Sequence, residues 1–110
     1  MLRYYFEYVK DLIPNADQLE FVALKVMEDS TSGIHVREME LSVLAYLNLP
    51  DEILLISRSD GRGELAYRLA WVRTKSKAKG HMERVEQSLW RITESGADFL
   101  RNSEANKPTS

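Results

Sequence analysis

A mainly α-helical domain with one short β-hairpin is the fold that the sequence predicts, and three features of its second half support it. Residues 64–79 show the apolar spacing of a helix, and Gly80 stops the pattern. Two short strand-like stretches, 82–86 and 89–93, follow the helix and can pair as a hairpin. A glycine-marked turn at 60–63 precedes the helix. A turn, a helix and a hairpin in this order are typical of a winged helix-turn-helix.

Three further helices are expected in the first half of the chain. Residues 2–13 place apolar side chains at helical spacing, and Pro14 ends this pattern because proline cannot continue a helix. Asn15 or Asp17 caps the next helix, and another begins at about Val36. In the helix after Asn15, the residues predicted to form the apolar stripe are Leu19, Phe21, Val22 and Val26. In the helix that begins at about Val36, they are Met39, Val43, Leu44 and Leu47.

The length of 110 residues suits a single domain with one modest hydrophobic core. We assign residues 1–101 to this domain, with a last helical turn or two through Phe99 and Leu100. Residues 102–110 are polar and contain proline, which is a composition typical of a disordered linker or tail.

Composition argues against several classes of site and location. No apolar run approaches the ~18 residues that span a bilayer, so no membrane partner is expected. The absence of cysteine removes thiolate chemistry and zinc fingers, and it suits the cytoplasm as the predicted location. Only two histidines, His35 and His81, are present, and Glu86, Glu94 and Asp98 form no convincing acid pair. We therefore predict no cofactor, no metal site and no catalytic residue in this chain.

The charges are unevenly distributed along the chain. Residues 57–84 carry eight Lys or Arg against three Asp or Glu, a local net charge of +5. The whole chain has a net charge of −2, so the remainder carries seven Lys or Arg against fourteen acids, or −7. Clustered cations on an acidic protein are typical of a surface that binds a polyanion, because each neutralised phosphate releases counterions. Together with the turn before the helix and the hairpin after it, this pattern predicts double-stranded DNA as the partner; the alternative is that these cations only form a solvated helix face.

The helix expected at 64–79 separates into faces at about 3.6 residues per turn. Its core stripe is predicted to consist of Leu65, Leu69, Val72 and Ser76. On the opposite side, the small residues Ala66 and Ala70 would let the helix approach a DNA groove closely. Base or phosphate contacts are expected there from Arg73, Thr74 and Lys77, and backbone contacts on the flank from Arg68, Lys75 and Lys79. The full predicted DNA-binding set is Arg62, Tyr67, Arg68, Arg73, Thr74, Lys75, Lys77, Lys79 and Arg84.

Residues 67–100 also match a known family pattern. The matching residues are Arg68, Leu69 and Trp71 in the helix, Gly80 at its end, and Trp90, Arg91, Ile92, Thr93, Glu94, Gly96 and Leu100 beyond it. On these residues the chain resembles the winged-helix domain at the N-terminus of Mrr-type restriction endonucleases. It departs from that pattern at Ser76 and His81, which replace leucines, and at Gln87-Ser88, which replaces an Arg-Gly pair in the wing.

The resemblance implies that the domain is the target-reading part of a restriction endonuclease, in some relatives one that reads modified bases. It also implies a separate C-terminal nuclease domain of the PD-(D/E)xK kind in the parent protein, so that this chain is not itself an enzyme. Trp71 and Trp90 match positions that are expected to pack within the domain rather than to contact bases.

The sequence leaves two other functions open. A small transcriptional regulator with the same fold would bind an unmodified palindromic site as a dimer. A protein-interaction module would instead dock the basic helix on an acidic partner. The aromatic residues Tyr4, Tyr5, Phe6 and Tyr8 either extend the core or form a homodimer surface at the N-terminal helices, and we favour the core.

Overall fold

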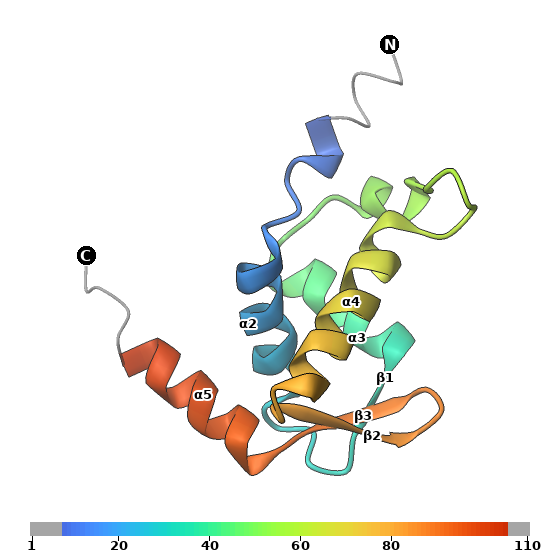
Figure 1. Cartoon of the computed structure of the whole chain (residues 1–110). Coiled ribbons are helices and arrows are strands. Elements are labelled where there is room, and N and C mark those ends of the chain that lie inside the picture. Colours follow the sequence, from blue (N-terminus) through green and yellow to red (C-terminus); the bar gives the residue numbers. More distant parts are fainter. Residues whose placement is uncertain (1–7, 106–110) are drawn as a thin grey trace.

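The computed structural model describes residues 8–105 and consists of helices with a small sheet at one end (Figure 1). Residues 8–10 are helical, but 11–13 form a turn, so the helix expected at 2–13 ends before Asp11; its residues 2–7 lie outside the described part. The helices that follow are α2 (Ala16–Met27), α3 (Val36–Tyr46), the short 3₁₀ helix η1 (Asp51–Leu55), α4 (Glu64–Ala78) and α5 (Glu94–Ala105). The strands are β1 (Ile34–His35), β2 (Met82–Glu86) and β3 (Leu89–Ile92).

The predicted hairpin is confirmed, and a third strand, β1, pairs with it. The sheet is antiparallel in the order β1-β3-β2, so that Ile34 on β1 and Arg84 on β2 both lie opposite Trp90 on the central strand. The register between β2 and β3 shifts between Arg84 and Glu86. Strand β1 has only two residues, too few for a period-two pattern to be recognised in the sequence.

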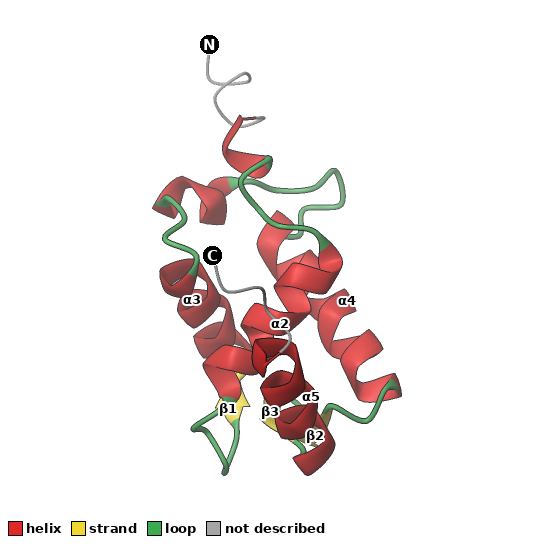
Figure 2. Cartoon of the chain, turned by 90° about the vertical axis from the view of Figure 1, so that its left-hand side faces the viewer, coloured by secondary structure: helices red, strands yellow, loops and turns green. Residues whose placement is uncertain are grey.

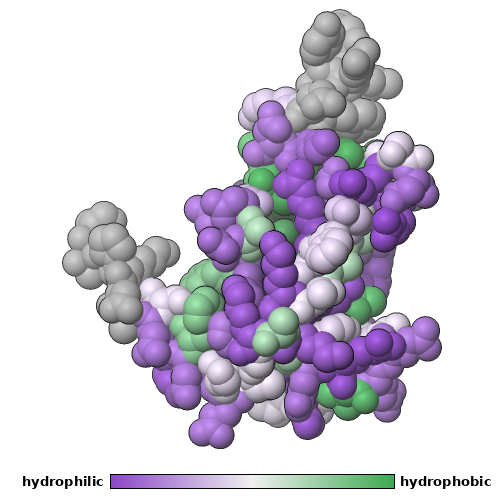
Figure 3. All heavy atoms as spheres, in the orientation of Figure 1, coloured by the Kyte–Doolittle hydropathy of each residue, from purple (hydrophilic) through white to green (hydrophobic). Residues whose placement is uncertain are grey.

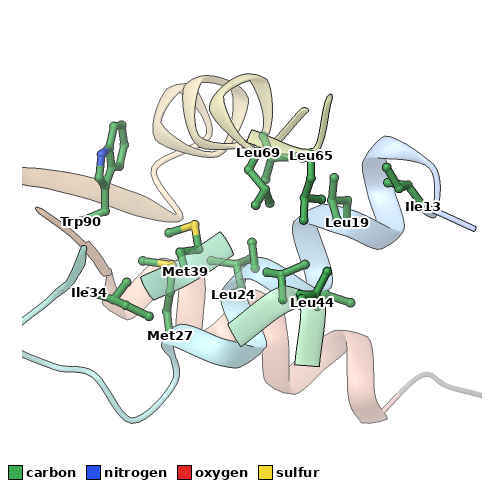
Figure 4. Packing of buried hydrophobic residues seen from close by; sticks show 14 of the residues in the cluster. Ile13, Leu19, Leu24, Met27, Ile34, Met39, Leu44, Leu65, Leu69 and Trp90 are labelled. Atoms are coloured by element: carbon green, nitrogen blue, oxygen red, sulfur yellow. The ribbon is translucent and has the colours of Figure 1, made fainter. Parts of the chain in front are cut away.

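Helix α2 lies between α3 and α4, and the three helices enclose the core (Figure 2). The predicted stripes of α3 and α4 are buried, apart from Leu47, which is partly buried. In α2 the stripe is wider than predicted, because Ala23, Leu24 and Met27 are fully buried while Phe21 and Val26 only border the core. Figure 4 shows the apolar side chains of the three helices converging.

Local signals account for most of the element boundaries. The Asn15 side chain accepts a hydrogen bond of 2.9 Å from the Gln18 N–H and caps α2, so Asn15 is the N-cap and not Asp17. Gly80 has a φ of +82° immediately after α4, a conformation that favours glycine and ends the helix as predicted. Asp51 begins η1 after Pro50.

Helix α5 is longer than the sequence indicated. Residues 102–105 were assigned to the tail, yet they are helical; residues 106–110 lie outside the described part. Leu100 is fully buried, and the Lys25 ammonium on α2 lies 2.8 Å from the Glu104 carboxylate. These two contacts stabilise a polar segment as helix, although its composition alone does not predict one. No helix within residues 8–105 has the length and apolar character that crossing a membrane requires.

Candidate nucleic-acid interface

Helix α4 is positioned by the stripe that the sequence predicted. All four residues of this stripe, Leu65, Leu69, Val72 and Ser76, are buried. Of the remaining sides of the helix, one faces α3, one faces solvent and one faces α2. The Ser76 hydroxyl is buried and has no hydrogen-bond partner within the described part of the chain. Figure 3 shows a pale surface over α4 bordered by strongly hydrophilic groups. The predicted DNA-binding residues of α4 are therefore divided between two sides of the helix, whereas Arg62 lies in the preceding turn and Arg84 on β2.

Arg73 lies on the side of α4 that faces α3 and the hairpin. Its guanidinium carbon is 5.8 Å from the centre of the Trp90 ring, and its Nη1 is 4.0 Å from the Met39 sulfur. Burial lowers the pKa of Arg73, an effect that the nearby Glu40 carboxylate opposes. Arg84 is exposed and lies directly across from Trp90 in the hairpin, on the same face of the sheet. The structure thus brings Arg73 and Arg84, from different elements, to the same tryptophan.

Arg37 is a neighbour of Arg73 that the sequence analysis missed. Its side chain is 68% exposed and lies 3.6 Å from Glu40, and all three residues line a cavity of about 140 Å³ between α3 and α4. A cation in the first turn of a helix is unfavourable because it opposes the helix dipole. The position of Arg37 at the start of α3 was therefore the signal in the sequence that could have indicated a functional role. Thr74 and Lys77 are exposed further along α4. We call Arg37, Arg73, Thr74, Lys77 and Arg84 the basic face.

Three other predicted residues lie on the opposite flank of α4, toward α2. Arg68 and Lys79 are held in ion pairs there: the Arg68 Nε lies 3.1 Å from Glu64 and the Lys79 ammonium 3.0 Å from Glu20. Lys75 is exposed and forms no ion pair with any residue that the structure describes. These three side chains are separated from Arg73 by the body of the helix.

Glu64, at the start of α4, is a buried carboxylate that three cations share. It is 4% exposed, and its oxygens lie 3.6 Å from the Lys10 ammonium, 3.2 Å from Arg58 and 3.1 Å from Arg68. Burial raises the pKa of Glu64, but the hydrogen bond from Arg68 and the charges of Arg68, Lys10 and Arg58 outweigh it, so the pKa lies below its ordinary value. We call these four residues the Glu64 cluster; its net charge is +2.

Tyr67 is covered by the arginines of the preceding turn. The guanidinium carbon of Arg58 is 3.7 Å from the centre of the Tyr67 ring, and that of Arg62 is 4.9 Å away. Arg62 is also paired with Asp60 at 2.7 Å. Both predicted residues, Arg62 and Tyr67, are thus engaged within the protein at the start of α4.

A groove of about 260 Å³ runs between α2 and α4. Its apolar lining comes from Pro14, Ala16, Leu19, Val72 and the rings of Tyr67 and Trp71. Trp71 is 52% exposed, so the expectation that it packs inside the domain is wrong, whereas Trp90 is 9% exposed and packs as expected. Trp71 is exposed because it lies between the outward side of α4 and the α2 flank, away from the core stripe.

The element order α2-β1-α3-α4-β2-β3, with a recognition-type helix followed by a hairpin, defines a winged helix-turn-helix domain. The chain belongs to the Mrr N-terminal domain family, whose model matches residues 17–102. This match extends the resemblance seen at 67–100 back to α2, and the domain is a non-catalytic one associated with restriction systems. Comparison with curated proteins and with solved structures gave no match. Within residues 8–105 no three His, Cys, Asp or Glu side chains gather as a metal site would require.

Proposed function

We propose that this domain binds double-stranded DNA and selects the target of a restriction endonuclease, with α4 in the major groove and the β2–β3 hairpin beside it. The observation that carries the proposal is the placement of Arg73 on α4 and Arg84 on β2 around Trp90. A recognition helix and a wing that present cations on one side can contact bases and the adjacent backbone at the same time.

The basic face has the shape and chemistry that such a contact needs. Ala66 and Ala70 are small, so α4 can approach the floor of a groove that is ~12 Å wide. Arg73 is held by Met39 and Trp90 and suits the two acceptors of a guanine edge. The wing tip, Gln87-Ser88, has no cation, and Arg91 on β3 is paired with Glu83, so Arg84 is the hairpin cation on the same face of the sheet as Trp90.

Cleavage would belong to another domain of the parent protein. The family is non-catalytic, and we propose that a C-terminal nuclease domain acts on the DNA that this domain has bound. The target is proposed to carry a modified base or a specific sequence, and duplexes of both kinds distinguish these possibilities.

The decisive experiment is fluorescence anisotropy with short labelled duplexes, unmodified, methylated and hydroxymethylated, at low and at physiological salt. We expect binding that weakens as salt rises, and a loss of affinity in Arg73→Ala and Lys77→Ala. Lys25→Ala is the matched control, because Lys25 pairs with Glu104 away from the basic face. Binding to no duplex at either salt, or unchanged binding by both basic-face variants, would overturn the proposal.

A further inference from the structure

The groove between α2 and α4 is a second surface that the proposed duplex contact does not use. The more exposed of its two aromatic rings is that of Trp71, and Tyr67 meets this ring edge to face, with ring centres 6.5 Å apart. Because Arg58 lies 3.7 Å over the Tyr67 ring, Tyr67 is engaged and orients Trp71, while the Trp71 ring is left open. A half-exposed tryptophan that a neighbour holds in one orientation is a ready stacking surface.

The charge around this groove suits a nucleic-acid strand. The Glu64 cluster, with its net charge of +2, lies at one end, where Arg68 lines the groove. Lys75 adds a charge that no described residue neutralises, and Lys79 follows one turn later. The acids in the lining are Glu20, which pairs with Lys79, and Asp17. Arg68, Lys75 and Lys79 thus form a row along α4 next to Trp71. Cations that follow a strand's backbone beside an aromatic platform are the features by which proteins bind unpaired nucleotides.

We propose that the groove binds an unpaired nucleobase of a DNA strand, stacked on Trp71, with the neighbouring phosphates near Lys75 and the Glu64 cluster. The groove, about 260 Å³, lies at the small end of ligand pockets, which favours one planar heterocycle over a folded partner segment. Glu20 lines the same groove, and its Oε2 is buried without a hydrogen-bond partner among the described residues, whereas Lys79 binds its Oε1; Oε2 is the acceptor that we assign to a base amino group.

Tryptophan fluorescence of the full chain tests this inference. The protein has two tryptophans, and Trp90 is buried, so quenching by an oligothymidine or oligocytidine strand reports on Trp71. We expect quenching on strand addition, and a loss of strand affinity of about tenfold in Trp71→Ala, the cost of one lost base–aromatic stack. Trp71→Phe keeps an aromatic platform and should retain most of the affinity, which separates stacking from folding. Both variants lack the Trp71 fluorophore, so their binding to the strand is followed by anisotropy.

The same variants separate this site from the duplex site. Trp71→Ala should leave binding to a fully paired duplex unchanged, whereas Arg73→Ala should weaken the duplex and spare the single strand. Absence of quenching, or equal strand affinity for Trp71→Ala and the parent chain, would overturn the groove inference and leave the duplex proposal intact. Strand binding that depends on Trp71, without any duplex binding, would support the groove inference and overturn the duplex proposal.

Discussion

Glu64 shows how one buried acid organises the start of the recognition helix. Its carboxylate accepts hydrogen bonds from Arg58 and Arg68, and Arg58 in turn covers the ring of Tyr67. The turn before α4, the helix itself and the segment that carries Lys10 are therefore joined through a single side chain. In the sequence Glu64 counts only as a negative charge, but in the structure it connects three segments.

Glu64→Gln should lower the free energy of unfolding by about 1–3 kcal/mol at neutral pH, because three cations lose their shared carboxylate. The folded-state pKa of Glu64 lies below its ordinary value of 4.5, so its contribution is present above that pH and is lost as pH falls through the folded pKa. Urea unfolding of both proteins at neutral and acid pH measures this. The difference should shrink in acid; a constant difference would contradict the assignment, and the exposed Glu86→Gln is the control.

Arg73→Lys should weaken binding to the preferred duplex almost as much as Arg73→Ala, although the charge is kept. The planar guanidinium lies near Trp90 and can donate two parallel hydrogen bonds, which an ammonium cannot do. The expected loss is about 1–3 kcal/mol, concentrated on one base pair of the site. Competition anisotropy with single base-pair changes measures it. Full retention of affinity by the lysine variant would mean that Arg73 acts only as a charge.

At the scale of elements, the hairpin and α5 are joined where Gly96 meets His81. A side chain at Gly96 would collide with the backbone carbonyl of His81, the residue that links α4 to β2. His81 also stacks on Phe99 with ring centres 4.4 Å apart, and the Thr93 N–H donates to the His81 carbonyl at 3.0 Å. The position of α5 against the start of the hairpin therefore depends on this close contact.

Gly96→Ala should destabilise the domain by about 1–3 kcal/mol, because backbone atoms must shift to admit one methyl group. The exposed Ser95→Ala, in the same helical turn, should change stability little. Thermal unfolding followed by circular dichroism compares the two. Equal melting temperatures would show that α5 moves away at no cost.

Elements with strong periodicity could be predicted from the sequence, and those fixed by tertiary contacts could not. The core stripe of α4 follows from spacing alone, because Leu65, Leu69 and Val72 recur on one side. Strand β1 has two residues and exists because it pairs with β3. The end of α5 packs through Leu100 and is joined to α2 by the Lys25–Glu104 ion pair, which connects residues far apart in the chain.

The candidate site was predictable only in part for the same reason. Charge counting located α4 and the hairpin, but it could not show that Arg68 and Lys79 are paired with buried acids while Arg73 approaches Trp90. Tyr8, expected in the core with the other N-terminal aromatics, is 64% exposed, and Tyr4, Tyr5 and Phe6 lie outside the described residues. A homodimer through this region remains a proposal.

Over the whole molecule, a net charge of −2 means that attraction to DNA must come from the local distribution of charge. The basic face offers four cations, Arg37, Arg73, Lys77 and Arg84. If Arg37, Lys77 and Arg84 each neutralise one phosphate while Arg73 contacts a base, the logarithm of the duplex affinity should fall with the logarithm of salt concentration with a slope of about −3. A salt titration of anisotropy gives this slope.

Lys77→Ala should reduce the magnitude of that slope by about one, because one fewer counterion is released. Lys25→Ala should leave it unchanged, since its charge lies beside Glu104. A slope near zero for the parent chain would show that the basic face does not meet phosphates and would favour the protein-partner alternative.

The small sheet also bears on how the protein behaves at high concentration. Its outer edge is β2, whose ladder is irregular between Arg84 and Glu86 and carries the charged Glu83, Arg84 and Glu86. Its other edge is β1, which is two residues long. Charges, irregular pairing and short edge strands all hinder edge-to-edge association. Neither edge offers a template for strand addition, so the hairpin can project from the domain without promoting aggregation.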